Sequence, residues 1–471
     1  MKLPILMVCV STQQNTTNVL PAINLDVKSI LIVETSKAHN EKWSDGMIKV
    51  LKKRGFDVLS PILLTKEQDS RIDLIQKKLE NELPKSYEII WNLGGGQKAQ
   101  QLALWQTFIF RKVAEKDEIA CYANPDNHHL EMWEYNTNNR QMEFTYSELN
   151  SNLSLYEIFC IYGYQADVHE SDRIFPQNIN DNKSLLDKLM EFEQFREYFF
   201  KIPTISYGNP DNQYKFSRDD FSDIIKKQNK ELTKVIETWI DLKISNRETL
   251  SIQEFKNLSL GIKNLIRDFI SDIFNKEMKY NSIAINMNLQ LLLHEITNKE
   301  IKYLEYSNDF VKDVFQAKKI SFFFEKIIVD RLQKLLINYK HNIFEAYQNI
   351  NIYKDNKIVG EHDVILVTKW GTIISIDAKT YDLEQKEYDA RLLNLREGAG
   401  RYVKYIPVFP FFVEDMEKDY FPTKLKDLLL KLSENRIKFY TYNYYENNLT
   451  VTYQNKEIEI NPIEQLLTTV F

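Results

Sequence analysis

Short apolar runs alternate with helical patterns along roughly the first 125 residues. The apolar runs predict β-strands at Ile5–Val10, Ile30–Val33, Phe56–Leu59 and Glu88–Asn92. Between them, apolar residues recur at helical spacing near Trp43–Arg54, Glu67–Leu83 and Gln97–Ala114. Because strands that alternate with helices form parallel sheets covered by helices, this region is expected to be a doubly wound α/β domain. Ligands of such sheets bind at the carboxyl ends of the strands.

The pattern of apolar positions changes twice after this region. Residues 129–147 predict a β-hairpin that turns around Asn136–Arg140. From about 150 to 345 the spacing is helical and predicts helices packed in a core, as in Leu185, Leu186, Leu189, Phe192 and Phe195. From about 350 strands return, with two β runs at Lys357–Thr368 and Thr372–Thr380 around the turn Lys369-Trp370-Gly371.

Length and composition are those of an ordinary globular protein. The chain has 471 residues, of which 43% are hydrophobic and 27% are charged, and this length predicts two to four domains. The net charge of -6 excludes a protein that is basic over its whole surface. Any contact with nucleic acid is therefore expected from a local patch or a metal site.

Cysteines and apolar segments bear on where the protein works. The spacing of Cys9, Cys121 and Cys160 matches neither a disulfide framework nor a zinc site, which favours free thiols in a reduced cytosol. Pro4 interrupts the first apolar segment, and polar residues follow it, so it predicts a strand rather than a signal peptide. Because no stretch is long and apolar enough to span a bilayer, a cytoplasmic protein without membrane contact is expected.

Acidic residues and a lysine fall on the two C-terminal β runs. If the loop comprises residues 369–371, antiparallel register places Asp363 directly opposite Asp377, with Cβ atoms roughly 4.5–5.5 Å apart. Asp377 and Lys379 are two residues apart and share a face, and Glu361 joins Asp363 by the same rule. His362 is expected to point to the other face.

Two opposed carboxylates repel each other unless a cation or a proton lies between them. Oxygen ligands suit Mg²⁺ or Mn²⁺, and Lys379 can help to deprotonate a water or stabilise charge on a phosphate. Phosphodiester hydrolysis requires this combination of groups. The alternative is a solvated hairpin face with a surface Asp–Lys pair.

With Glu-x-Asp opening one apolar strand and Asp-x-Lys closing the next, the segment resembles the PD-(D/E)xK nuclease superfamily in its restriction-endonuclease-like form. The resemblance implies a metal-dependent phosphodiesterase in an α/β domain over residues 316–471. Asp363 and Asp377 would hold the metal, with Glu361 beside them, and Lys379 would be the catalytic lysine. Asp377 stands where Glu is commoner. Glu325 would add an acidic catalytic residue from a preceding helix, or else face solvent.

Basic residues follow the lysine, around the turn Gly398-Ala399-Gly400. A helix and a glycine-rich turn are expected at 388–402. The polar side chains here either contact a nucleic-acid backbone or form a solvated surface, and they are Arg391, Asn394, Arg396 and Arg401.

The N-terminal region has a glycine-rich turn, Gly94-Gly95-Gly96-Gln97-Lys98, between a strand and a helix. Three of the 12 glycines of the chain lie here, so general glycine abundance does not explain it. Glycines allow backbone N–H groups to approach an anion, a helix N-terminus favours negative charge, and Lys98 adds a positive charge. The sequence matches neither a Walker loop nor a Rossmann fingerprint. A tight strand-to-helix turn with positive φ is the alternative.

Together with the polar stretch after the first strand, this turn resembles CARF domains, which sense cyclic oligoadenylates in type III CRISPR immunity. Family members often carry Thr-Gly-Gly-Thr-Lys at the turn, and both threonines are replaced here. The resemblance implies a Rossmann-like sensor over residues 1–150. Its ligand-binding residues would be Ser11, Thr12, Gln13, Asn15, Gly95, Gly96, Gln97 and Lys98, with Thr35 as a weaker candidate. The stretch Leu153–Ala166, with Tyr162-Gly163-Tyr164, resembles the connector of CARF–nuclease effectors.

The two resemblances together imply a Mn²⁺- or Mg²⁺-dependent nuclease that a cyclic oligoadenylate activates, cyclic tetra-adenylate being favoured. It would cleave single-stranded DNA or RNA, or nick duplex DNA, in antiviral defence. A homodimer is expected because a twofold axis matches a symmetric ring. Residues 151–315 would form a mainly helical connector. The alternatives are a CARF regulator with an inactive nuclease domain and a constitutive restriction or repair nuclease.

Overall fold

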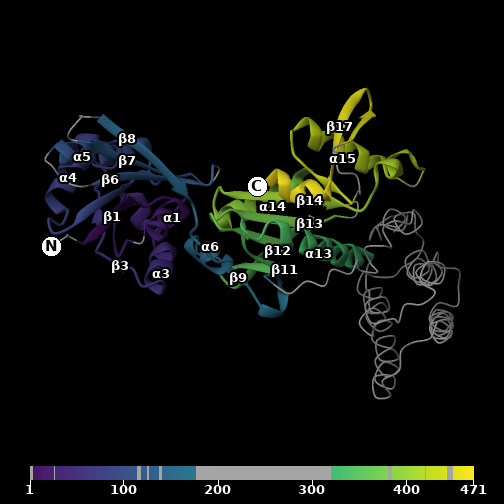
Figure 1. The fold of residues 1–471 in the computed structure, drawn as a ribbon, viewed down its shortest axis with the longest axis horizontal. Coiled ribbons are helices and arrows are strands. Elements are labelled where there is room, and N and C mark those ends of the chain that lie inside the picture. Colours follow the sequence, from purple (N-terminus) through teal and green to yellow (C-terminus); the bar gives the residue numbers. More distant parts are fainter. Residues whose placement is uncertain are drawn as a thin grey trace, which may run out of the picture.

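The computed structural model describes residues 4–25, 27–113, 118–124, 127–136, 141–176, 320–379, 385–419, 421–442 and 449–470. The predicted helical stripe at 185–195 and most of the predicted connector lie outside these ranges. Two α/β domains result, each built on one sheet, and helix α6 (Leu155–Ile161) lies between them (Figure 1). None of the described helices is both long and apolar enough to cross a membrane.

The N-terminal sheet has the strand order β3-β2-β1-β5-β6-β7-β8, with β4 also paired to β2. Strands β1 to β6 pair in parallel, which confirms the predicted alternation of strands and helices. Strands β7 and β8 form the predicted antiparallel hairpin, with β8 at the edge of the sheet. The strands are β1 (Ile5–Val10), β2 (Ser29–Glu34), β3 (Asp57–Val58), β4 (Ile62–Leu63), β5 (Glu88–Asn92), β6 (Ile119–Asn124), β7 (His129–Asn136) and β8 (Gln141–Glu148).

Helices cover both faces of this sheet, which explains why its central strands are apolar throughout. Along β1, Leu6, Val8 and Val10 belong to the hydrophobic cluster under α4 and α5, whereas Met7 and Cys9 belong to the cluster under α1 and α3. Side chains alternate across a strand, so one apolar run serves two cores. The helices are α1 (Thr16–Asn24), α2 (Ser36–Asn40), α3 (Asp45–Lys53), α4 (Ile72–Glu82) and α5 (Lys98–Val113).

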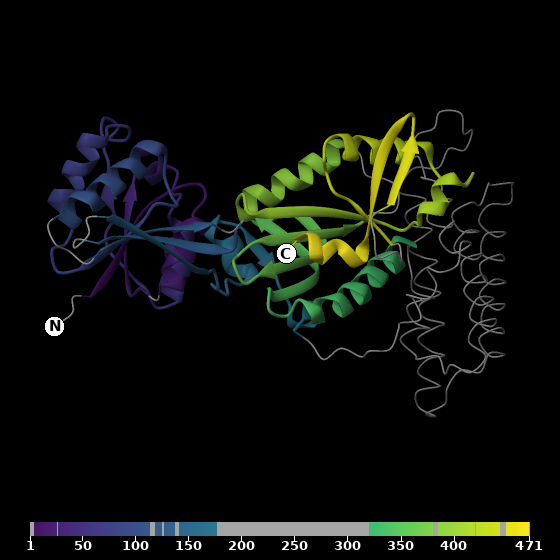
Figure 2. The same cartoon turned by 45° about the horizontal axis from the view of Figure 1, so that its top comes forward.

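The C-terminal sheet has the order β10-β11-β12-β13-β14-β15-β17-β16, with β9 also paired to β11. Its first strands pair antiparallel up to β13, and β13, β14, β15 and β17 then pair in parallel. Helices lie on both faces of the sheet (Figure 2). The strands are β9 (Gln165–Asp167), β10 (Arg173–Phe175), β11 (Ile343–Lys354), β12 (Lys357–Thr368), β13 (Ile373–Ala378), β14 (Val403–Phe409), β15 (Tyr440–Thr441), β16 (Leu449–Tyr453) and β17 (Lys456–Pro462).

The helices of this domain are α13 (Ile320–Asn338), α14 (Gln385–Ala399), α15 (Thr423–Glu434) and α16 (Leu466–Val470), with short 3₁₀ turns at Glu170–Asp172, Val413–Glu417 and Ile463–Gln465. Strand β12 has its predicted bounds, and α14 is the predicted helix after the lysine. Strands β9 and β10 belong to this sheet although their residues were expected in the connector. Three-residue strands are too short to show the alternation that predicts longer ones.

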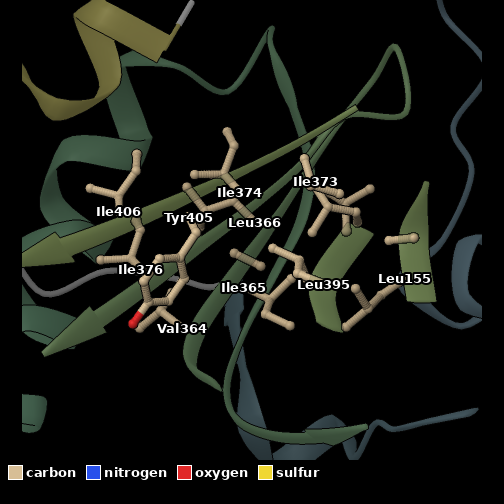
Figure 3. Close-up of a cluster of buried hydrophobic side chains, with 14 of the residues drawn as sticks. Leu155, Val364, Ile365, Leu366, Ile373, Ile374, Ile376, Leu395, Tyr405 and Ile406 are labelled. Atoms are coloured by element: carbon tan, nitrogen blue, oxygen red, sulfur yellow. The ribbon is translucent and has the colours of Figure 1, made fainter. Parts of the chain in front are cut away.

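The two domains share one hydrophobic core. A single cluster of buried side chains extends from β1 and α1 through α6 to β12, β13 and α14. Figure 3 shows Leu155 of α6 in this cluster with Ile365 of β12 and Leu395 of α14. Hydrogen bonds also cross the junction, from the Ser151 backbone N–H to the Lys369 carbonyl, 2.8 Å away, among others. The domains therefore pack against each other as a continuous body.

The glycine-rich turn between β5 and α5 passes directly over the end of β1. A Cβ added to Gly95 would lie 2.3 Å from the Val10 carbonyl oxygen and 2.7 Å from Oδ1 of Asn18. Gly96 has a φ of +84°, a conformation that side chains other than glycine rarely adopt. The close approach of the backbone to β1 therefore requires glycine at position 95, and the left-handed conformation favours glycine at position 96.

Gly95→Ala is expected to lower the thermal stability of the protein, because the added methyl group would overlap the Val10 carbonyl oxygen and the backbone would have to shift. Overpacking of this kind costs roughly 1–3 kcal/mol. Gly55→Ala is the comparison variant, since Gly55 has a positive φ of +86° but no neighbour within 4 Å of an added Cβ, so its fall in stability comes from backbone strain without overpacking. Scanning calorimetry should show the larger fall in melting temperature for Gly95→Ala. Equal falls would contradict the close approach.

Candidate functional site

The two aspartates of the C-terminal hairpin lie together at the ends of β12 and β13. The register pairs Val364 with Ile376, so the next residues along it are Asp363 and Asp377, as the turn length predicts. Each carboxylate accepts a hydrogen bond from the backbone of the other strand. The Ala378 N–H donates to Oδ2 of Asp363 at 2.7 Å, and the Asp363 N–H donates to Oδ1 of Asp377 at 3.4 Å.

The carboxylate of Asp377 is fully buried and is held from three sides. At its Oδ2 atom, Arg391 of α14 donates at 2.7 Å, the Tyr405 hydroxyl of β14 donates at 2.9 Å, and the Lys379 ammonium lies 3.4 Å away. Burial alone would raise the pKa of Asp377, but the nearby positive charges, of which Lys379 is the strongest, lower that pKa. Asp377 is therefore ionised.

Asp363 has the opposite electrostatic environment. Its pKa is raised to about 7, first because the side chain is buried and then because Asp377 is negatively charged beside it. The negative charge of Glu325 in α13 raises this pKa further. An ionised carboxylate next to one that holds its proton near neutral pH is an arrangement that a cation stabilises.

The donor set fits a hard divalent cation of the Mg²⁺ type. Among the described residues, no group of three or more His, Cys, Asp or Glu side chains is placed to hold a metal ion. Glu361 is exposed and Glu325 is half-buried, so neither completes such a group with the two aspartates. Mg²⁺ needs only one or two carboxylates when waters and substrate phosphates supply the other oxygens. Asp363 and Asp377 meet that requirement.

The expected orientation of His362 is wrong. Its Nδ1 atom lies 2.8 Å from the Ser375 hydroxyl, and Ser375 shares a strand face with Asp377 because the two are two residues apart. Strand alternation alone would point the His362 ring away from this face, but the buried ring finds its hydrogen-bond partner in the Ser375 hydroxyl. Burial lowers the pKa of His362, which keeps the ring neutral.

The basic residues after the lysine take separate roles. Arg391 is bonded to Asp377 and, at 2.9 Å, to Glu387, so it belongs to the aspartate site rather than to a solvated surface. Asn394 donates to the Val359 carbonyl, and Arg396 is exposed. The i,i+4 spacing of Glu387 and Arg391 predicts only their pairing along the helix, and no local signal identifies the contact of Arg391 with Asp377.

A second site lies at the top of the N-terminal sheet. The strand order reverses between β1 and β5, and open α/β sheets bind ligands at such a switch point. A cavity of about 390 Å³ is found there. Its lining comprises Thr12, Gln14, Leu93, Gly94, Gly96, Gln101, Tyr122, Trp133 and Arg401. Thr12 and Gly96 were predicted as ligand-binding residues.

Other predicted ligand-binding residues are absent from the lining of this cavity and bond to neighbouring segments of the N-terminal domain. Ser11 accepts a hydrogen bond from Ser44 at 2.7 Å, and Asn15 donates to the Trp43 carbonyl at 2.6 Å. Thr35 caps α2 by accepting from the Ala38 N–H at 3.1 Å. Their side chains shape the loops, and Gly95 allows the turn to approach β1.

The remaining predicted residues do not line the cavity. Gln13, Gln97 and Lys98 are exposed side chains of the same loops. The cavity instead takes residues from distant segments that no local motif identified. These are Gln101 of α5, Tyr122 of β6, Trp133 of β7 and Arg401 of the C-terminal domain.

Comparison with known proteins gives a likeness of fold. No family model matches the chain, and no curated protein matches it. The structure of Can2 from Sulfobacillus thermosulfidooxidans in complex with cyclic tetra-adenylate matches with a TM-score of 0.51 and 12% identity, over 93% of this chain and 95% of that one. Protein VC1899 from Vibrio cholerae matches with a TM-score of 0.50 and 12% identity, over 93% of this chain and 94% of that one. The chain therefore shares its fold with these two proteins over nearly their full lengths.

Proposed function

We propose that this protein is a metal-dependent nuclease that a cyclic oligoadenylate activates, and that it serves type III CRISPR defence. The observation that carries the proposal is the buried pair of Asp363 and Asp377 with Lys379 beside it. Its substrate would be single-stranded DNA or RNA, or duplex DNA that it nicks. A solvated hairpin face does not account for these residues, because Asp377 has no solvent exposure.

Each residue of the aspartate site has a separate role in the proposed reaction. A Mg²⁺ or Mn²⁺ ion bound by Asp363 and Asp377 would polarise the phosphate and lower the pKa of a water. Lys379, whose side chain is 15% exposed, stabilises the negative charge that develops on the phosphate. Arg391 and Tyr405 fix the Asp377 carboxylate from the side of α14 and β14. Glu325, whose negative charge raises the pKa of Asp363, is the candidate for a further acidic group.

The N-terminal cavity suits part of a cyclic oligoadenylate. Its volume, about 390 Å³, lies at the lower end of the range of ligand pockets, about 300–1,000 Å³. A ring of four nucleotides therefore needs a second such pocket, which a twofold homodimer supplies. Tyr122 and Trp133 offer aromatic surfaces to adenine, and the glycine turn offers backbone N–H groups to phosphate. The cyclic tetra-adenylate in the Can2 structure supports the choice of this ring.

Wild-type protein is expected to cleave single-stranded DNA, plasmid or RNA in Mn²⁺ when cyclic tetra-adenylate is added, and Lys379→Ala should lower the rate at least 100-fold. Loss of one charged group that stabilises the transition state costs about 10²–10³ in rate. Lys424→Ala, at an exposed lysine of α15, is the matched control and should cleave like wild type. Gel assays with each substrate measure the rates.

Two results would contradict parts of this proposal. Equal cleavage with and without the ring would favour a constitutive nuclease. Binding of the ring with no cleavage of any substrate, and with no Mn²⁺ bound, would favour a regulator whose second domain is inactive.

Asp363→Asn is expected to stabilise the metal-free protein at neutral pH. The pKa of this carboxyl rises on folding from about 3.9 to about 7. Its contribution to the stability of the fold is complete below about pH 3.9 and is lost as the pH rises to about 7. Asn keeps the acceptor for the Ala378 N–H without the charge. The variant should therefore gain roughly 2–4 kcal/mol over wild type by about pH 8, as measured by denaturant unfolding in EDTA.

Asp355→Asn, in the exposed turn between β11 and β12, is the control and should show no such gain. Mn²⁺ should stabilise wild type and leave Asp363→Asn unchanged. A difference between Asp363→Asn and wild type that stays constant from about pH 4 to pH 8 would show that Asp363 is not held beside a second charge.

A further inference from the structure

One residue of the cavity in the N-terminal domain belongs to the C-terminal domain. Arg401 lies in the turn between α14 and β14, and it lines the cavity with residues of α5, β6 and β7 and of the loops that follow β1 and β5. Its backbone N–H donates to Oε1 of Gln14 at 2.7 Å. Its guanidinium lies 3.4 Å from the Tyr122 hydroxyl and 4.7 Å from the Tyr402 ring centre. The side chain is thus held at the rim of the cavity by both domains.

The turn that carries Arg401 is fixed against the N-terminal domain. A Cβ added to Gly400, whose φ is +82°, would lie 2.1 Å from the Tyr162 hydroxyl. That hydroxyl is bonded to Oγ1 of Thr16 at 2.7 Å, so α1 holds it in place. Two residues earlier, Gly398 packs on the Phe159 ring, and a Cβ added to it would lie 2.9 Å from that ring. Two glycines of α14 and its turn therefore bring Arg401 into the cavity.

Charge distinguishes Arg401 from every other residue of the lining. The other eight are Thr12, Gln14, Leu93, Gly94, Gly96, Gln101, Tyr122 and Trp133, all of them uncharged. Lys98, the positive charge expected from the sequence, is exposed and absent from the lining. An anionic ligand in this cavity has one formal positive charge to pair with, and an Arg guanidinium binds phosphate through paired N–H groups.

We propose that Arg401 is a ligand-binding residue that the C-terminal domain contributes to the N-terminal cavity, where it pairs with a phosphate of the bound nucleotide ring. This inference rests on the proposed cyclic oligoadenylate. Because the contact forms only when the two domains are placed as described, a ligand that uses it binds this arrangement more tightly and stabilises it.

The middle of the same helix contacts the aspartate site. Arg391, which is bonded to Asp377, lies eight residues before Ala399, the last residue of α14, and this is about 12 Å at the helical rise. Occupancy of the cavity thereby acts on the position of the arginine that holds the buried carboxylate.

The test uses the full chain and the variants Arg401→Ala, Arg401→Gln and Arg401→Lys, with Arg396→Ala as the matched control on the exposed side of α14. Isothermal titration in EDTA measures binding of cyclic tetra-adenylate. Loss of one charged contact to phosphate is expected to weaken binding about 10- to 100-fold in Arg401→Ala and Arg401→Gln. Arg401→Lys, which keeps the charge, should recover most of the affinity, and Arg396→Ala should bind like wild type.

The outcomes separate this inference from the function on which it rests. Every variant keeps the bond from the backbone N–H of residue 401 to Gln14, and a Gln side chain can still donate to Tyr122 without a charge, so a merely structural role would leave Arg401→Gln at wild-type affinity. Wild-type affinity in Arg401→Gln overturns the ligand contact and leaves the proposed activation intact. Failure of the wild-type protein to bind cyclic tetra-adenylate or cyclic hexa-adenylate overturns both.

Discussion

A carboxylate with no exposure to solvent, Asp377, holds the C-terminal domain in its arrangement. Burial of an unpaired charge would cost several kcal/mol, so each partner of Asp377 must stay in place. Those partners come from different elements, Arg391 from α14 and Tyr405 from β14. Helix α14 is thereby docked on the sheet near its middle, and its C-terminal end packs against α6 and the N-terminal domain. One buried charge thus influences the placement of both domains.

Most of the C-terminal hairpin could be predicted from sequence because its geometry is local. A three-residue turn and the alternation of side chains determine the register, and they place Asp363 and Asp377 together without knowledge of the rest of the fold. The orientation of His362 could not be predicted in this way, since the bond to Ser375 outweighs alternation. Arg391 was assigned to a general basic surface because its contact with Asp377 depends on how α14 crosses the sheet.

The N-terminal cavity shows the same division between local and distant information. The glycine turn and the polar end of β1 lie at the switch point that the parallel topology creates, and both could be predicted from the strand pattern. The residue that supplies positive charge to the cavity could not be predicted from the strand pattern. Lys98 follows the glycines in sequence but is exposed outside the lining, whereas Arg401 reaches the cavity through packing between domains. The glycine motif therefore identifies the loop that approaches the ligand, whereas the packing of the domains determines which charged side chain reaches the cavity.

Under the proposed function, α14 offers a short physical route between ligand and active site. Its buried face, which includes Tyr388, Leu395 and Ala399, packs into the shared core, so the helix moves as a unit rather than bending. A shift at its C-terminal turn is then also a shift of Arg391 relative to Asp377. Since a buried carboxylate tolerates loss of a partner poorly, small displacements there carry a large energy. Two sites that bias the same rigid element are coupled by that element, and neither domain has to refold for the coupling to act.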